Sequence, residues 1–520
     1  FSMRSVILLT SLSLALSDAA RAPVSVKVRL DEAIAHVKPE YVSFNFDASY
    51  WRRPLKSGGM DLKNKELNML TQALGPAYLR VGGTQADFDV YAIGETASQT
   101  CDDLPGNMTK FRCQLVTEDE WTGLLDFVTR NKVSLVFGLN DLWDRPTKIE
   151  HELSICGDTS CPPRNQENLK SLLMWTAKNR LDAPIYGFEL GNELNVVFPG
   201  SVGAKTQADD FHALSALIKE LWPEHTPKLL GPDTHSWTEF KDVGLDWWKS
   251  FVPAVVGVVD AYTFHMYSMG KGSKLDPANL DGSFLNATQL DTCIMGAAPL
   301  VKIVSEHGKG AEIWGGEVSS ANRGHTDITD TYINGFWYMD QLGAHAALGV
   351  SVFQRQTLTG AGSYPLINIT APDGVPFPLP DYWLALLHKR LMGQAVFNTT
   401  SDSQNVRVYA HCAVGGGIAV AFLNLDDEAT EVSFSGEMGS TREEFFLQAG
   451  EKIPGAKHPL QSRDVTLNGM PLKVLNGAMP DITGRTVEGT TVTMPPTSYG
   501  FVRFPHAKAA CTADGHVIVV

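Results

Sequence analysis

Two glutamates stand where short hydrophobic runs end, a placement that can support acid–base chemistry. Glu193 follows the run "IYGFEL" within a Gly-Asn-Glu triplet, and Glu317 ends the run "AEIWGGE". Runs of this length are typical of buried strands, so each carboxyl group would lie where a strand meets solvent. A lone glutamate at such a place is more often a helix cap or a surface acid. A facing pair can hydrolyse a glycosidic bond, with one acid protonating the leaving oxygen and the other attacking or activating water.

The elements that would position these glutamates repeat along the first three quarters of the chain. Eight hydrophobic runs, most of them followed by an amphipathic stretch such as "EDEWTGLLDFVTRNK", predict strands over 42–47, 77–83, 133–140, 185–193, 228–234, 260–267, 311–317 and 351–357. Eight strand–helix units predict an α/β fold, the (β/α)₈ barrel, whose active site lies at the C-terminal ends of the strands. An open doubly wound sheet is the alternative, but no glycine-rich nucleotide fingerprint follows the first strand.

The pattern changes at about residue 395, where short alternating runs such as "NVRVYAHCA" and "GIAVAFLNL" are separated by turn residues. This pattern is typical of an antiparallel β-sandwich. We therefore expect a catalytic barrel over residues 39–392 and a C-terminal β-sandwich over residues 393–520. An N-terminal strand within residues 23–38 is expected to join the sandwich.

Residues 1–22 resemble a secretory signal peptide, with Arg4 before an apolar stretch and Ala20-Arg21-Ala22 as a small-x-small cleavage site. A buried N-terminal strand is the alternative. This stretch is too short to span a membrane, and no other segment is long enough. We expect a secreted or extracellular protein, or one delivered to a lysosome-like compartment by the secretory route.

Cysteines and glycosylation triplets fit such a route. The four Asn-x-Ser/Thr triplets are at Asn107, Asn286, Asn368 and Asn398. Of the seven cysteines, Cys101 with Cys113 and Cys156 with Cys161 are close enough in sequence to close small loops. Cys412 and Cys511 would then join the C-terminal region and leave Cys293 free. Metal binding is the competing interpretation, but the chain has no CxxC pair and no histidine cluster, so we expect no metal and no other cofactor.

The net charge of −15 argues against nucleic acid and against an anionic membrane surface as the main partner. It also makes a highly sulfated polyanion a less natural substrate, although a local basic patch could override the global sign. A hydrophobic content of 43% and a charged content of 19% are typical of a globular protein with a sizeable core. We expect a monomer.

Longer motifs are similar to those of the heparanase and β-glucuronidase group, glycoside hydrolase family 79. The motifs are "AYLRVGGTQADF", "FELGNELN", "TFHMY", "GEVSSA", "FWYMDQLG" and "RQTLTGAGSYPLI". The likeness covers nearly the whole mature chain and is closer to plant and microbial members than to animal heparanase. It implies a retaining mechanism in which Glu193 is the acid/base and Glu317 the nucleophile, and it supports the cysteine pairing.

The same resemblance gives neighbouring residues supporting roles. Tyr267 would hydrogen-bond the nucleophile, and Arg80 would help to keep it charged. Asn192 would bond the sugar 2-hydroxyl, a contact that strengthens in the transition state. An aromatic residue of the barrel rim is the alternative for Tyr267, and a structural buried ion pair is the alternative for Arg80.

Two glycine-rich loops, over 319–327 and 360–364, are expected to select the substrate. By resemblance, the amides of Gly324 and Gly362 and the hydroxyl of Tyr364 receive a uronic acid carboxylate, because fixed backbone donors suit an anion. A tight turn is the alternative for such loops. Relatives have more glycine where this chain has Asn322-Arg323, so this loop would be shaped differently or gain a cation near the carboxylate. Partners expected for the sugar hydroxyls are Asp47, Ser49, Thr84 and Gln85.

These observations favour a β-glucuronidase that cleaves glucuronic acid from carbohydrates or glucuronide conjugates. An endo-acting heparanase is the alternative, which the acidic charge and the absence of evident basic clusters disfavour. A catalytically silent carbohydrate-binding protein is disfavoured by the presence of both glutamates and Tyr267. A sibling hydrolase for neutral sugars is disfavoured by the expected carboxylate pocket, whose donors a neutral sugar would leave unpaired.

Overall fold

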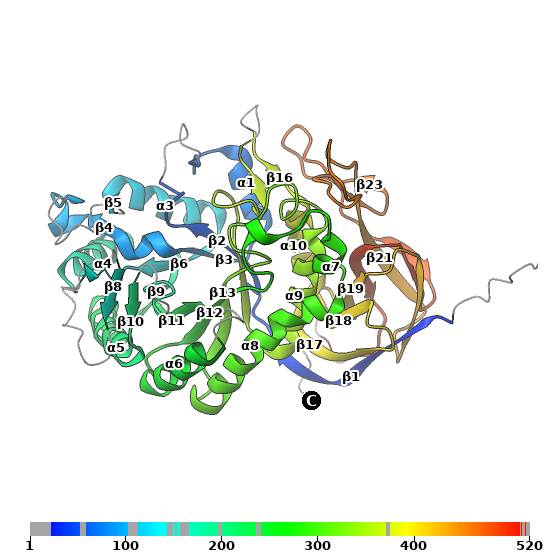
Figure 1. The fold of residues 1–520 in the computed structure, drawn as a ribbon, viewed down its shortest axis with the longest axis horizontal. Coiled ribbons are helices and arrows are strands. Elements are labelled where there is room, and N and C mark those ends of the chain that lie inside the picture. The colour runs from blue at the N-terminus through cyan, green and yellow to red at the C-terminus, as the bar shows by residue number, and fades with distance from the viewer. Residues whose placement is uncertain are drawn as a thin grey trace, which may run out of the picture.

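The computed structural model has a barrel on one side and a sheet-rich part on the other (Figure 1). It describes residues 22–52, 59–101, 113–142, 149–150, 153–156, 166–195, 200–235, 241–370, 375–509, 511 and 515. Most of the predicted signal segment, together with Asn107 and Cys161, lies outside these residues.

Eight parallel strands close into a barrel and follow one another around it in chain order. They are β2 (Val42–Asp47), β3 (Tyr78–Gly82), β6 (Ser134–Leu139), β9 (Ile185–Leu190), β11 (Lys228–His235), β12 (Ala261–Tyr267), β13 (Glu312–Ser319) and β14 (Val352–Arg355). Each coincides with one of the eight predicted runs, so the (β/α)₈ prediction is confirmed. The open-sheet alternative is wrong, because β14 pairs with β2 and closes the ring.

Helices on the outside of the barrel form where the sequence supplies an apolar stripe and a cap. In α3 (Glu118–Asn131), Thr117 and Glu120 form a capping box, and buried Trp121, Leu125 and Val128 face the barrel. The other helices are α1 (Lys65–Ala73), α4 (Glu167–Asn179), α5 (Ala204–Leu221), α6 (Lys241–Ala254), α7 (Leu280–Phe284), α8 (Ala287–His307), α9 (Asn334–Leu348) and α10 (Pro380–Leu391). Within the described residues, no helix is both long and apolar enough to cross a membrane.

Short strands and 3₁₀ turns lie in the segments that connect the elements of the barrel. Strands β4 (Asp89–Ala92) and β5 (Gln114–Thr117) pair with each other, as do β15 (Ile367–Asn368) and β16 (Phe377–Pro378). Strands β7 (Ile149–Glu150), β8 (Leu153–Cys156) and β10 (Gly200–Val202) form a small sheet. Within the part of the chain that the structure describes, the 3₁₀ turns of the barrel are η2 (Thr84–Phe88), η3 (Gly94–Thr96) and η6 (Gly272–Lys274).

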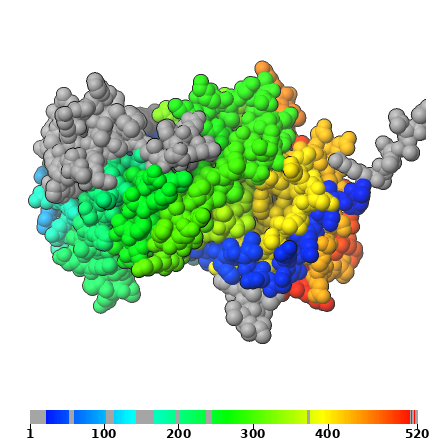
Figure 2. Space-filling model, turned by 60° about the horizontal axis from the view of Figure 1, so that its bottom comes forward, coloured from blue at the N-terminus to red at the C-terminus, as the bar shows by residue number. Residues whose placement is uncertain are grey.

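The C-terminal part is an 11-stranded, mainly antiparallel sheet, as predicted. Its strands are β17 (Met392–Ser401), β18 (Val406–Ala413), β19 (Ile418–Asn424), β20 (Thr430–Ser435), β21 (Thr441–Ala449), β22 (Val465–Leu467), β23 (Met470–Pro471), β24 (Arg485–Glu488), β25 (Thr491–Met494), β26 (Ser498–Phe504) and the N-terminal β1 (Val24–His36). Strand β1 pairs antiparallel with β17 and parallel with β20. Figure 2 shows this blue strand against the yellow segment that contains β17 and β18.

Side chains of this sheet alternate between two cores. In β19, Ile418, Val420 and Phe422 enter the core that the sheet encloses. Ala419 and Ala421 enter the core shared with the barrel helices instead. This period of two is the pattern that identified the strands in the sequence.

Helices α9 and α10 lie between the barrel and the sheet (Figure 1). Two glycines of α9 allow close approach: a Cβ at Gly335 would overlap Tyr499, and one at Gly343 would overlap the ring of Tyr409. The Tyr409 hydroxyl donates to Asp340 Oδ1 (2.6 Å), and Arg407 pairs with the same buried carboxylate. The two parts therefore meet through a packed and ion-paired interface.

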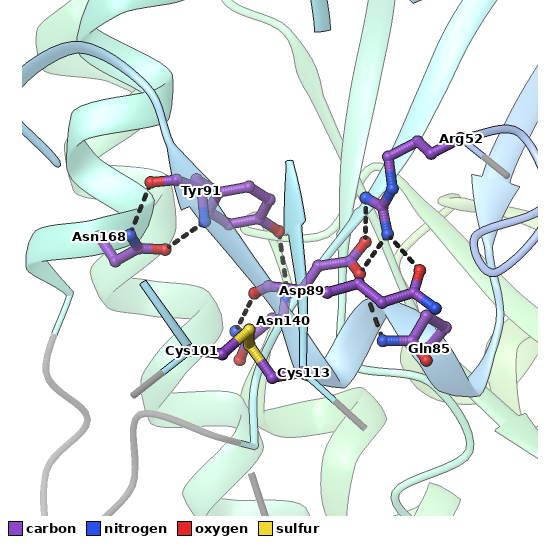
Figure 3. Close-up of a disulfide and its surroundings, with 9 residues drawn as sticks. Arg52, Gln85, Asp89, Tyr91, Cys101, Cys113, Asn140 and Asn168 are labelled. Atoms are coloured by element: carbon purple, nitrogen blue, oxygen red, sulfur yellow. Dashed lines mark hydrogen bonds and ion pairs between the residues drawn. A yellow bond between two sulfur atoms is a disulfide. The ribbon is translucent and has the colours of Figure 1, made fainter. Parts of the chain in front are cut away.

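Two of the three expected disulfides are present, Cys101–Cys113 and Cys412–Cys511. Figure 3 draws the first together with Asp89, whose carboxylate accepts from Nη1 (3.0 Å) and Nη2 (2.6 Å) of Arg52. Cys293 is a free, buried thiol, as expected. The Cys156–Cys161 pairing stays a prediction.

The close packing at Gly343 leads us to expect that a larger residue there destabilises the protein. Gly343→Ala should displace the Tyr409 ring and lower the free energy of unfolding by about 1–3 kcal/mol, measured by urea denaturation. Gly123→Ala in α3 is the matched control, since a Cβ there meets no atom within 4 Å. It should raise stability by about 0.5–1 kcal/mol because it lowers the entropy of the unfolded chain. Equal effects of the two variants would contradict this account of the interface.

Candidate active site

The C-terminal ends of the barrel strands bring ionisable side chains from six of the eight strands to one end of the barrel. Glu193 follows β9, and Glu317 lies near the end of β13. Arg80, Asp233, His235, His265 and Tyr267 come from β3, β11 and β12, and Asp47 ends β2. Parallel strands that close in chain order place all these residues around one opening.

Both oxygens of Glu317 accept hydrogen bonds. The hydroxyl of Tyr267 donates to Oε1, and Nη1 of Arg80 donates to Oε2 (2.9 Å). The carboxyl group is nearly buried, with 9% of its side chain exposed. Its orientation is therefore fixed by two donors from β12 and β3.

Arg80 is the centre of a buried polar network. Its Nε donates to Glu189 Oε2 (2.7 Å), and its Nη2 donates to Asn192 Oδ1 (3.0 Å) and Asp233 Oδ2 (3.2 Å). Burial lowers the pKa of the guanidinium, but attraction to Glu189, Asp233 and Glu317 outweighs it and raises that pKa. Gly82 makes room for the group, since a Cβ there would lie 2.6 Å from Arg80 Cζ.

Glu193 is held in an uncommon backbone conformation. Its φ angle of 56° lies in the left-handed region that side chains usually avoid, and its N–H donates to Asp233 O (2.8 Å). Its Oε1 lies 3.0 Å from Nδ1 of His235 and 3.0 Å from Nδ1 of His265. Burial raises the pKa of Glu193, but the two histidines outweigh it and lower that pKa. The free protein therefore favours the ionised carboxylate.

His265 is buried between carboxylates. Its Nε2 lies 3.4 Å from Asp233 Oδ1, opposite the ring nitrogen that faces Glu193. Burial lowers the pKa of His265, but Glu317, Asp233 and Glu193 raise it to about 10. Burial raises the pKa of Glu189, Arg80 lowers it and the adjacent negative charge of Asp233 raises it, with a rise as the net result. The arrangement thus favours an imidazolium at 265.

One oxygen of Glu193 and one of Glu317 lie within 4.8 Å of each other, together with a ring nitrogen of His265. This spacing falls near the separation of about 5–5.5 Å between the carboxyl groups of retaining glycosidases. Three such donors could also hold a metal ion. However, the Arg80 guanidinium already lies 2.9 Å from Glu317, and its positive charge would repel a second cation.

The two glycine-rich loops contact each other. Gly324 pairs with Ser363 in a β-bridge, and a Cβ at Gly324 or at Gly362 would lie 2.8 Å from the Tyr364 ring. The N–H of Gly324 donates to Ala321 O (3.0 Å), so a bound carboxylate would have to compete with that bond. Burial raises the pKa of the Tyr364 hydroxyl, and the negative charges of Glu317 and Asp47 raise it further.

The sandwich supports the first of these loops. Arg463 pairs with Asp327 (2.5 Å) and Asp330 (2.7 Å), which follow Gly324 in the chain. Gln461 Nε2 donates to Asp327 O (2.7 Å). The shape of the loop therefore depends on contacts from both parts of the molecule.

The other four residues expected to contact the sugar do not all lie in one group. Asp47 faces the site, since Glu317 and Arg80 both act on its pKa, although burial is the larger influence and raises it. Ser49 donates its hydroxyl to Asp47 Oδ1 (2.5 Å). Gln85 instead donates to Asp89 (3.5 Å), in the Arg52 group of Figure 3. Thr84 begins the turn η2 beside these residues.

Sequence reasoning missed four ionisable members of this network. Glu189 lies inside a predicted strand, where side chains facing the barrel interior could not be told from those facing the helices. Asp233, His235 and His265 stand at or near strand ends in "GPDTH" and "TFHMY". The rule that identified Glu193 and Glu317 could have identified these three.

Comparison with known proteins places the chain in a family. The model of glycosyl hydrolase family 79, N-terminal domain, matches residues 43–343. Baicalin-β-D-glucuronidase from Scutellaria baicalensis is 33% identical over 79% of this chain and 76% of its own. Heparanase from Rattus norvegicus is 28% identical over 91% of this chain and 92% of its own.

A solved structure with the same fold covers most of the chain. It is a 4-O-α-L-rhamnosyl-β-D-glucuronidase from Fusarium oxysporum, with a TM-score of 0.63 and 16% identity over 92% of this chain and 100% of its own. The family match and the first relative together show that this chain is a glycoside hydrolase belonging to glycosyl hydrolase family 79.

Proposed function

We propose that the protein hydrolyses β-linked glucuronides with retention of configuration, with Glu193 as acid/base and Glu317 as nucleophile. The observation that carries this proposal is that one oxygen of Glu193 and one oxygen of Glu317 lie within 4.8 Å of each other. A wider gap would be needed to admit the water that an inverting enzyme activates.

In the first step Glu317 attacks the anomeric carbon, and Glu193 gives a proton to the leaving oxygen. Tyr267 and Arg80 bond the two oxygens of Glu317 and orient it for attack. Asn192 is anchored through its N–H to Asp87 Oδ2 (2.8 Å) and through its Oδ1 to Arg80, which directs its amide toward the sugar 2-hydroxyl.

In the second step Glu193 acts as a base and takes a proton from water. The water oxygen attacks the anomeric carbon, and the bond between that carbon and Glu317 breaks. The ionised form of Glu193 in the free protein is the form that this step needs. Because the histidines lower its pKa, acidic solution favours the protonated form required in the first step. An acidic optimum therefore fits the proposed pair.

Specificity for a uronic acid is assigned to the pocket formed by Gly324, Gly362 and Tyr364. The buried Tyr364 hydroxyl lies near Glu317, and Arg323 stands exposed on the adjoining loop with a φ of 63°. The relatives named glucuronidase support a glucuronide as substrate. Export as a monomer is part of the proposal, and the two disulfides fit an oxidising route.

The catalytic assignment predicts the effect of removing each charge. Glu193→Gln should slow hydrolysis of a glucuronide with a poor leaving group by about 10²- to 10⁴-fold, the usual contribution of a general acid. Glu317→Gln should lose at least as much, because no covalent intermediate can form. The measurement is kcat on an aryl β-glucuronide, with melting temperature as the check on folding. Glu306→Gln on the exposed surface of α8 is the control, and near-wild-type turnover in either active-site variant would reject the assignment.

The pocket assignment predicts a change in substrate preference. Tyr364→Phe removes one donor to a charged carboxylate, worth about 1.5–3 kcal/mol, so kcat/KM on a β-glucuronide should fall about 10- to 150-fold. The matching β-glucoside has no carboxylate and should lose much less. Both substrates are assayed with one leaving group. An equal loss on the two would show that Tyr364 does not bind the carboxylate.

A further inference from the structure

We propose that His235 is a positioning residue that saturates Oε1 of Glu193, so that the proton given to the leaving group sits on Oε2. This inference rests on the proposed role of Glu193 as acid/base. His235 would not touch the reacting atoms and would act only through Glu193.

The geometry supports a shared role for two histidines. His235 and His265 are register partners on the neighbouring strands β11 and β12, and Nδ1 of each lies 3.0 Å from the same oxygen of Glu193. A carboxylate oxygen has two acceptor sites, so the two rings fill Oε1 when each carries a proton on Nδ1. A proton taken up by Glu193 then has only Oε2 available.

The backbone around Glu193 is held without the His235 side chain. Glu193 N–H donates to Asp233 O (2.8 Å). Asn195 Nδ2 donates to His235 O (3.0 Å), and its Oδ1 accepts from His235 N–H (3.0 Å). Three hydrogen bonds thus tie the end of β9 to the end of β11. Replacing the imidazole should therefore change the surroundings of the carboxyl group and leave the strand ends in place.

The other charged and titratable groups around Glu193 come from three strands. His265 and Tyr267 face it from β12, Glu317 from β13, and the Arg80 guanidinium from β3 through Glu317. His265 is also tied to Asp233 inside the barrel (3.4 Å). His235 stands closer to solvent, with 9% of its side chain exposed. It is therefore the partner whose removal disturbs the buried network least.

Two kinetic signatures follow. A donor that bonds the charged carboxylate lowers its pKa, so losing the donor raises it. The alkaline limb of the kcat/KM profile, where the acid loses its proton, should then move to higher pH. In addition, a proton that can settle on Oε1 no longer reaches the leaving oxygen, which harms poor leaving groups more than good ones.

The experiment compares His235→Ala with His235→Asn, whose amide can donate from nearly the same place but cannot titrate. His225→Ala is the control, since it changes an exposed histidine just before the other end of β11. The readouts are kcat/KM across pH for phenyl and dinitrophenyl β-glucuronide, together with melting temperature. For His235→Ala we expect a loss of about ten-fold or more on the phenyl substrate, a smaller loss on the dinitrophenyl substrate, and an alkaline limb about one pH unit higher.

His235→Asn should keep the wild-type ratio between the two substrates. Equal losses on both, with an unmoved alkaline limb, would overturn the inference. If the alanine variant does not fold, a changed ratio between the two substrates in the asparagine variant would overturn it as well. If the wild-type protein cleaves aryl β-glucosides alone, the glucuronide proposal fails, and the same comparison on glucosides still tests His235. A folded wild-type protein that cleaves neither would overturn both proposals.

Discussion

The guanidinium of Arg80 lies buried among three carboxylates from three different strands, Glu189, Asp233 and Glu317. Removing such a cation from water costs several kcal/mol unless its partners surround it closely. The strands must therefore hold the three acids at matching positions along the barrel axis. The same group bonds Asn192, beside Glu193. One buried charge thus links β3, β9, β11 and β13 and positions both proposed catalytic acids.

His265 places a second cation beside the proposed catalytic carboxyl groups. The cations Arg80 and His265 lie among the carboxyl groups of Glu189, Asp233, Glu193 and Glu317. An oxocarbenium-like transition state is positive, and the Glu317 carboxylate would stabilise it. Because Glu193 is held by both histidines and Glu317 by Tyr267 and Arg80, the two carboxyl groups lie close together in different surroundings, as a retaining mechanism requires.

The fold was predictable because its strands are short, separate and strongly patterned. All eight barrel strands coincide with hydrophobic runs, and the short alternating runs after residue 395 indicated an antiparallel sheet. The site was predictable where a polar residue ends a strand, as at Glu193. Interior positions such as Glu189 were not, because periodicity does not tell which side chains of a buried strand pair with a distant arginine. The contact of Gln85 with Asp89 was not predictable either, because Asp89 also pairs with Arg52, which is far from it in sequence. The hydrogen bond from the Gly324 N–H to Ala321 O likewise belongs to a local turn, which the sequence motif does not specify.

The sandwich contributes to the site through the loop after β13, where Arg463 pairs with Asp327 and Asp330, which follow Gly324 in the chain.

The central claim concerns the chemistry of the two glutamates, and the stereochemistry of the first product tests it most directly. Proton NMR of a freshly started β-glucuronide hydrolysis should show β-glucuronic acid first, with the α anomer rising later by mutarotation. Initial release of the α anomer would mean a single displacement by water, and the proposed roles of Glu193 and Glu317 would be wrong.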